Sequence, residues 1–161
     1  MDGNIQEIEL FARVLLAALL GGLIGVQRES RGKAAGLRTN TLIAAGSAVF
    51  AVLSIRLVPQ VQGDPSRLAA AVVTGIGFLG AGAILRNEHD VLGLTTAATI
   101  WVNSGIGLCA GVGLYWTAIG TTVLTLFVLE VLPHLENRLG RRFGLKSENG
   151  RDEHKTRLNG H

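Results

Sequence analysis

Hydrophobic residues along this chain are grouped in long blocks that short polar segments separate. Residues 94–129 contain no Asp, Glu, Lys or Arg, and most of their side chains are apolar. A helix that crosses a bilayer needs about 20 predominantly apolar residues, so this block is long enough for two such helices. The stretch "AGVGLYW" (110–116) supplies glycines for a tight break, followed by Tyr115 and Trp116, which suit a membrane interface.

The other blocks predict three more helices of the same kind. Together the pattern predicts five membrane spans, over about residues 8–26, 41–58, 67–85, 94–112 and 114–132. The first block follows acidic residues and precedes no small-x-small cleavage site, so we interpret it as a retained helix and not as a signal peptide. The predicted fold is therefore all-α, a polytopic membrane helix bundle of about five transmembrane helices.

The bundle is expected to occupy residues 1–133, and residues 134–161 form a basic tail. We expect the tail to continue as a helix to about Gly140 and then to be disordered, because it is charged and contains glycines.

Charge is sparse and unevenly placed, since 48% of residues are hydrophobic and only 17% are charged. Lys and Arg gather in the loop over residues 27–40 and in the tail, which five spans place on the same side of the membrane. The excess of Lys and Arg in cytoplasmic loops then predicts an outside amino end and a cytoplasmic carboxyl end. We interpret the net charge of +3 as anchoring to anionic lipid, and we expect no nucleic-acid binding.

The stretch "GIGFLGAG" (75–82) fits the dinucleotide pattern G-x-G-x-x-G, but its context does not. That pattern follows a strand, opens a helix and precedes an acidic residue by about 20 positions. Here the glycines lie inside an apolar helix that begins near Asp64, a good helix cap. Membrane helices pack through small residues, so we interpret the glycines as contact positions and span 67–85 as central in the bundle. A ligand contact with exposed backbone is the alternative.

Small residues recur at helical spacing in four of the five spans. The predicted helix-packing positions are Gly21, Gly25, Gly75, Gly77, Gly80, Gly82, Gly107 and Gly111.

Four blocks of this sequence, in order, resemble the MgtC/SapB family of bacterial inner-membrane proteins. They are "GLIGVQRE" (22–29), "GLRTNTLIAAGSAVF" (36–50), "DPSRLAAAVVTGIGFLGAGAILR" (64–86) and "GLTTAATIWVNSGIGLCAGVGLY" (93–115). The resemblance covers roughly residues 10–132 and implies a small multi-pass protein of the bacterial inner membrane.

The resemblance also implies a biological setting. Better-known members are linked to growth at low magnesium and to survival inside host phagocytes, and some are thought to restrain the membrane ATP synthase. The resemblance implies a regulatory protein and not a direct magnesium transporter. Virulence-associated members carry a further soluble domain, for which residues 134–161 are too few. The chain therefore resembles the short form, and we carry over no virulence role.

Ionisable and polar groups at membrane depth are functional candidates because they are costly to bury. Arg28 is expected to act as an interfacial anchor or to pair with Glu29, which has Arg38 as a second candidate partner. Thr95 and Thr96 are expected to cap the fourth span, and Asn103 to form an interhelical hydrogen bond. The candidates, several of which match family positions by resemblance, are Arg28, Glu29, Arg38, Thr39, Asp64, Arg67, Arg86, Thr95, Thr96 and Asn103.

Catalytic and metal-binding chemistry is weakly represented. Mg²⁺ prefers oxygen ligands, yet the second, third and fourth spans contain no carboxylate. No nucleophile and base stand out, and the single Cys109 excludes an internal disulfide. We expect no enzyme activity, no cofactor and no bound metal. Expected partners are membrane lipids, a second copy of the chain and, by resemblance, a membrane protein such as the ATP synthase. A transporter or channel for Mg²⁺ or another ion is the alternative function.

Overall fold

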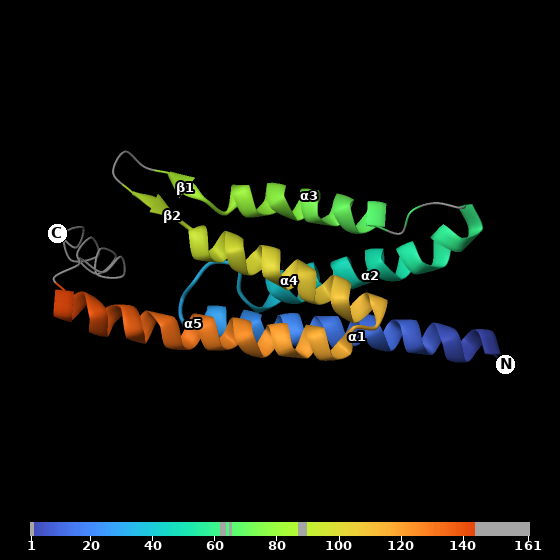
Figure 1. The fold of residues 1–161 in the computed structure, drawn as a ribbon, viewed down its shortest axis with the longest axis horizontal. Coiled ribbons are helices and arrows are strands. Elements are labelled where there is room, and N and C mark those ends of the chain that lie inside the picture. Colours follow the sequence, from blue (N-terminus) through green and yellow to red (C-terminus); the bar gives the residue numbers. More distant parts are fainter. Residues whose placement is uncertain (1, 62–63, 65, 87–89, 144–161) are drawn as a thin grey trace. The chain divides into compact units, whose positions relative to one another are not determined.

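Helices dominate the computed structural model, which describes residues 2–61, 64, 66–86 and 90–143. Each predicted span corresponds to one helix, so the expectation of an all-α bundle is confirmed (Figure 1). The helices are α1 (Asp2–Ser30), α2 (Leu37–Val61), α3 (Ser66–Gly82), α4 (Leu94–Val112) and α5 (Tyr115–Phe143).

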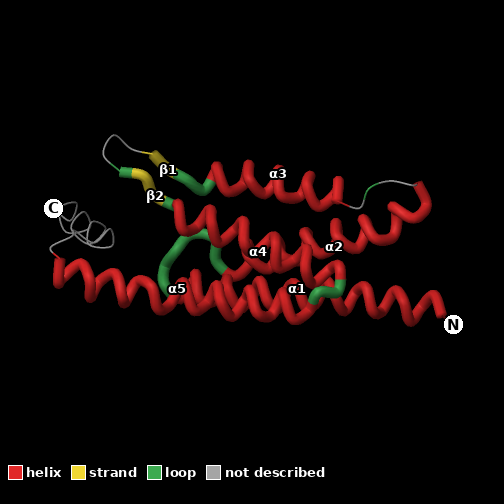
Figure 2. Tube along the Cα trace, in the orientation of Figure 1, coloured by secondary structure: helices red, strands yellow, loops and turns green. Residues whose placement is uncertain are grey.

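A short hairpin that the sequence analysis did not predict lies between α3 and α4 (Figure 2). Its antiparallel strands are β1 (Leu85–Arg86) and β2 (Val91–Leu92). Gly93 follows β2 with a φ of 88°, in the left-handed region that favours glycine. A side chain there would also collide with the carbonyl oxygen of Ala83, so glycine is required where the hairpin turns into α4.

The chain divides into two compact units, residues 1–125 and 126–161. In the first unit, α2 packs against both α1 and α4, and α1 also contacts α4. The fully buried apolar side chains of these three helices are mostly small, and they include Ala17, Ile24, Ala44, Ala48, Ile106 and Ala110.

The second unit holds the remainder of α5, which continues through Pro133 to Phe143. Residues 134–143 of the predicted tail are therefore helical, slightly further than the expected end near Gly140. The rest of the predicted tail, residues 144–161, lies outside the described residues.

Glycines let the backbones of α1, α2 and α4 approach closely. A Cβ added at Gly21 would lie 2.6 Å from the Cβ of Ala44, and one at Gly111 would lie 2.6 Å from the Cβ of Ala51. Lipid chains are as apolar as leucine, so membrane helices associate largely through such close van der Waals contact. The predicted packing positions at which a side chain would clash are Gly21, Gly25, Gly107 and Gly111.

Helix α3 does not have the central place that the glycine pattern predicted. It runs along α4 and touches α2, but within it only Ile76 and Gly80 are buried. A Cβ at Gly75, Gly77 or Gly82 would meet no atom within 4 Å, so these three do not pack against another described part of the chain. The central prediction was wrong because small residues permit close contact on a face without specifying what covers that face. Helices α2 and α4 are the ones packed on several sides.

Three helical segments are long and apolar enough to cross a membrane, namely Gln6–Ser30, Leu37–Leu57 and Tyr115–Leu135. Helix α3 is shorter, with 17 residues, and α4 carries Thr, Ser and Asn among its apolar residues. Large apolar side chains such as Phe78 and Trp116 are exposed, as expected for a surface that faces lipid. That α3 and α4 also cross the membrane stays a prediction.

Close backbone packing predicts that Gly107→Ala destabilises the bundle. The new methyl group would collide with the carbonyl oxygen of Ala44. Overpacking of this kind costs about 1–3 kcal/mol, which a lower thermal unfolding midpoint in detergent would report.

The matched control is Gly77→Ala, where the added methyl group meets open space. Because alanine is the better helix former, this variant should be at least as stable as the wild type, by up to about 1 kcal/mol. Equal loss of stability in both variants would contradict the assignment of close packing to α2 and α4.

Candidate functional site

An asparagine pair forms the most buried polar contact between α2 and α4. Asn103 is 0% exposed, and its Nδ2 donates to the backbone oxygen of Asn40 at 2.8 Å and to the Oδ1 of Asn40 at 3.0 Å. Asn40 in turn donates to the carbonyl oxygens of Ala35 and Gly36 at the start of α2. This is the interhelical hydrogen bond expected of Asn103, and it continues into the loop before α2.

A second polar contact lies further along the same interface. The hydroxyl of Ser47 donates to the hydroxyl of Ser104 at 3.0 Å, and both side chains are buried. Buried hydroxyls without partners are costly, so this pair stabilises one alignment of α2 against α4. The interface therefore combines close glycine contacts with two specific polar pairs.

Arg28 joins α1 to the beginning of α4. It lies in the last turn of α1, is only 5% exposed, and donates from Nη2 to Oγ1 of Thr96 at 2.6 Å. Thr96 lies in the first turn of α4 and is itself buried. The buried contact with Thr96 is thus neither of the two arrangements expected for Arg28, an interfacial anchor or a pair with Glu29.

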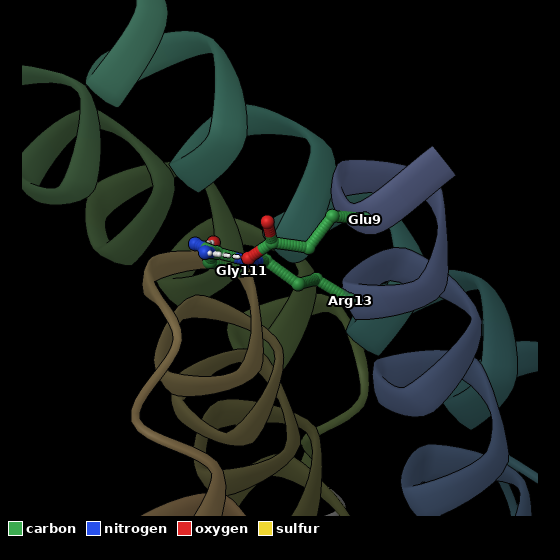
Figure 3. Close-up of polar contacts among 3 residues, drawn as sticks. All are labelled: Glu9, Arg13 and Gly111. Carbon is green, nitrogen blue, oxygen red and sulfur yellow. Dashed lines mark hydrogen bonds and ion pairs between the residues drawn. The ribbon is translucent and has the colours of Figure 1, made fainter. Parts of the chain in front are cut away.

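Arg13 joins α1 to the other end of α4 (Figure 3). Its Nη2 lies 2.6 Å from Oε1 of Glu9, and its Nη1 donates to the backbone oxygen of Gly111 at 3.3 Å. The guanidinium also lies 5.9 Å from the centre of the Tyr115 ring. Helices α1 and α4 therefore run antiparallel, with one arginine of α1 at each end of α4.

Two of the predicted acidic candidates hold helix ends. Oε2 of Glu29 accepts the backbone N–H of Leu37 at 2.8 Å, the first residue of α2. Asp64 accepts both the hydroxyl and the backbone N–H of Ser66 at the start of α3. These bonds lower the pKa of Asp64, so their stabilisation is present at neutral pH and is lost as pH falls through that pKa. Asp64 thus caps α3 as expected, whereas Glu29 forms no ion pair within the described chain.

The expectation that Thr95 and Thr96 cap α4 was wrong. The N-cap residue is Gly93, which follows the unpredicted hairpin, and no side chain makes a capping hydrogen bond there. Thr96 instead accepts from Arg28, and Thr95 is exposed. Arg86, which directly follows the predicted span over residues 67–85, lies in β1.

The predicted candidates do not form one cluster. Arg28 meets Thr96, and Asn103 meets Asn40 at a separate place. The other side chains on that list are exposed, namely Glu29, Arg38, Thr39, Asp64, Arg67, Arg86 and Thr95.

Asn40, Ser47, Ser104 and Arg13 were missing from the candidate list. A signal for two of them was present, because every fourth or third residue of one α2 face is small or polar and buried. That face comprises Asn40, Ala44, Ser47, Ala51 and Ser54.

No group of three or more His, Cys, Asp or Glu side chains that is able to hold a metal ion occurs in the described part of the chain. Helices α2, α3 and α4 contain no Asp or Glu at all. The polar side chains buried in the described part of the first unit are amides, hydroxyls and an arginine.

The MgtC family model matches residues 14–138, which include all five helices at least in part. The chain belongs to the MgtC family. Relatives include the "Putative magnesium transporter YhiD" of Escherichia coli K12, 49% identical over 137 residues, and the "Protein MgtC" of Salmonella typhimurium LT2, 44% identical over 141 residues.

These alignments cover 81% and 88% of this chain but only 64% and 60% of the two relatives. An uncharacterized protein of Haemophilus influenzae is 39% identical over 86% of this chain and 62% of its own length. The chain thus spans less than two thirds of the length of these curated relatives. No solved structure matches it.

The asparagine pair predicts energetic coupling between positions 40 and 103. In a double-mutant cycle of Asn40→Ala and Asn103→Ala, we expect a coupling of about 0.6 kcal/mol, with about 1.7 kcal/mol as the upper end for interhelical bonds in membranes. The measurement is the unfolding free energy in lipid of the purified wild type, the two single variants and the double variant.

The control cycle pairs Asn103→Ala with Thr74→Val. Thr74 is exposed, and among the described residues its hydroxyl bonds to Ala70 of its own helix, so its coupling to Asn103 should be near zero. A coupling between positions 40 and 103 no larger than this control would contradict a stabilising asparagine pair.

Proposed function

We propose that this chain is a non-enzymatic regulatory protein of a bacterial inner membrane, which acts through protein contacts and serves adaptation to low magnesium. The observation that carries the proposal is that buried polar side chains of α2 and α4 bond to one another. The asparagine and serine pairs between α2 and α4 bond to one another, and those helices and α3 contain no carboxylate. An interior of this kind holds helices together and lacks the charged oxygens of a cation path.

Helix α3 supports the part of the proposal that concerns protein contacts. Gly75, Gly77 and Gly82 leave its backbone open on faces that no part of the described chain covers closely. Small residues on an exposed helix allow another membrane helix to approach closely. A membrane protein such as the ATP synthase, as the family resemblance implies, or a second copy of the chain would supply that helix.

The contacts within the first unit support a sided placement in the membrane. The loop after α1 and the start of α4 lie at one end, where Arg28 meets Thr96. The end of α2 lies at the other end, where Arg56 is 3.1 Å from Glu7. Exposed Lys33, Arg38 and Arg86 belong to the first end, which we place in the cytoplasm under the positive-inside rule, with the amino end outside.

Ion transport is the second candidate function, and the name of the Escherichia coli relative favours it. In this chain a path would have to use amide and hydroxyl oxygens between α2 and α4, or between copies of the chain. The two proposals differ in one measurable quantity, the flux of Mg²⁺.

We expect no Mg²⁺ flux above background in sealed proteoliposomes that contain the purified protein, because the described interior offers no carboxylate ligands. A fluorescent Mg²⁺ indicator inside the vesicles measures entry, and protein-free vesicles give the background. Folding is checked by circular dichroism of the same samples. If the wild type showed saturable Mg²⁺ flux and Asn103→Ala abolished it, the regulatory proposal would be wrong and ion transport would take its place.

The exposed face of α3 predicts a site-specific crosslink. A photoreactive amino acid at position 77 should join this chain to a second protein in intact bacterial membranes, because a partner helix would lie against Gly77. Position 127 in α5 is the control. Phe127 is also exposed, but it is a large residue and not a glycine. Equal or absent adducts at the two positions would remove α3 as the contact surface.

A further inference from the structure

The guanidinium of Arg28 is a buried cation with few partners in the described chain. Only 5% of Arg28 is exposed, so it is 95% buried. Its Nε has no hydrogen-bond partner within the described residues. The bond to Thr96 uses one of five donors, and none of the ion pairs formed by described residues includes Arg28. Because a buried charge without a counter-charge is costly, Arg28 calls for a further partner.

Arg13, whose Nε also lacks a hydrogen-bond partner, has the counter-charge that Arg28 lacks. Arg13 has Glu9 at 2.6 Å and lies at the carboxyl end of α4, where the helix dipole favours positive charge. Arg28 lies at the amino end of α4, where the same dipole disfavours positive charge. The carboxyl end of α1 offsets part of the charge on Arg28 but provides no bond to its Nε.

The first turn of α4 adds donors that are also without partners in the helix. The first bond of this helix runs from the N–H of Ala97 to the oxygen of Gly93 at 2.9 Å. The N–H groups of Leu94, Thr95 and Thr96 therefore precede the ladder, and no side chain caps them. Donors of this kind together with a cation make a site for an anion.

We propose that Arg28 and the first turn of α4 bind a phosphate group, either free phosphate or the phosphate of an anionic lipid headgroup. Arg28 supplies its planar fork of N–H donors, a geometry that matches phosphate oxygens. The hydroxyl of Thr96 accepts from Arg28 and so directs its own hydrogen to the ligand. The backbone N–H groups of α4 complete the set of donors.

The position of the site suits both sources of phosphate. Leu94 and Thr95 are exposed while Thr96 and Arg28 are buried, so the first turn of α4 leads from the surface to the guanidinium. This binding site goes beyond the proposed function, because it would exist in a regulator and in a transporter alike.

The test compares the purified wild type with Arg28→Gln and with Lys33→Gln in neutral detergent. Each protein is titrated with inorganic phosphate, and separately with mixed micelles of phosphatidylglycerol, while thermal unfolding is followed. Potassium acetate and chloride at equal ionic strength, and micelles of phosphatidylcholine, are the matched ligands. Lys33→Gln removes the same unit of charge from the same end of the bundle without touching the proposed site.

We expect phosphate or phosphatidylglycerol to raise the unfolding midpoint of the wild type and of Lys33→Gln in a saturable way. The response of Arg28→Gln should require about tenfold more ligand or more, as expected when hydrogen bonds to a charged group are lost. Saturation by inorganic phosphate identifies a soluble ligand, and a response to phosphatidylglycerol alone identifies a lipid headgroup.

Two results would overturn the proposal. One is a wild type that phosphate and phosphatidylglycerol stabilise no more than acetate and phosphatidylcholine do. The other is an equal loss of response in Arg28→Gln and Lys33→Gln, which would reduce the effect to surface charge.

If Arg28→Gln does not fold, Thr96→Val takes its place, because it keeps the cation and removes only the hydroxyl. That variant should need several-fold more ligand than the wild type, and an unchanged response would count against the site.

Discussion

The close approach of α2 to α1 and α4 is the constraint on which the rest of the bundle depends. The hydrophobic effect contributes little to helix association in lipid, so association depends on van der Waals contact between closely packed helices. Glycine at positions 21 and 111 brings the backbones within reach of the alanines on α2. The side chain of Asn103 then bonds directly to the backbone of Asn40, a contact that wider spacing would not allow. Specific polar pairing in this protein is thus a consequence of small residues.

Much of this architecture follows from the sequence because apolar blocks determine where membrane helices begin and end. The span predicted over residues 94–112 coincides with α4, and the other predicted spans lie mainly within a single helix each. The faces with small residues on α1 and α4 were also recognised, since Gly21 and Gly107 lie at true contacts. These features depend on the composition of one helix at a time, which a single sequence displays.

The failures concern relations between helices. Gly75 and Gly107 are both glycines in apolar helices, yet only Gly107 meets another backbone. Thr95 and Thr96 look like caps, but the hairpin places Gly93 at that position instead. Glu29 has two basic residues nearby in sequence, and it bonds to the N–H of Leu37. In each case the partner that decides the contact lies in another element. The sequence around the residue therefore does not determine which contact forms.

The weak attachment of α3 has a consequence for motion. Proteins open locally in cooperative units, and an element with few buried contacts opens at a lower free energy than the core. Helix α3 buries only Ile76 and Gly80, and the hairpin ties it to α4 through the rigid turn at Gly93. We therefore expect α3 to open locally at a lower free energy than the helices that hold the asparagine and serine pairs. Amide hydrogens of α3 would then exchange with solvent before those of α2 and α4.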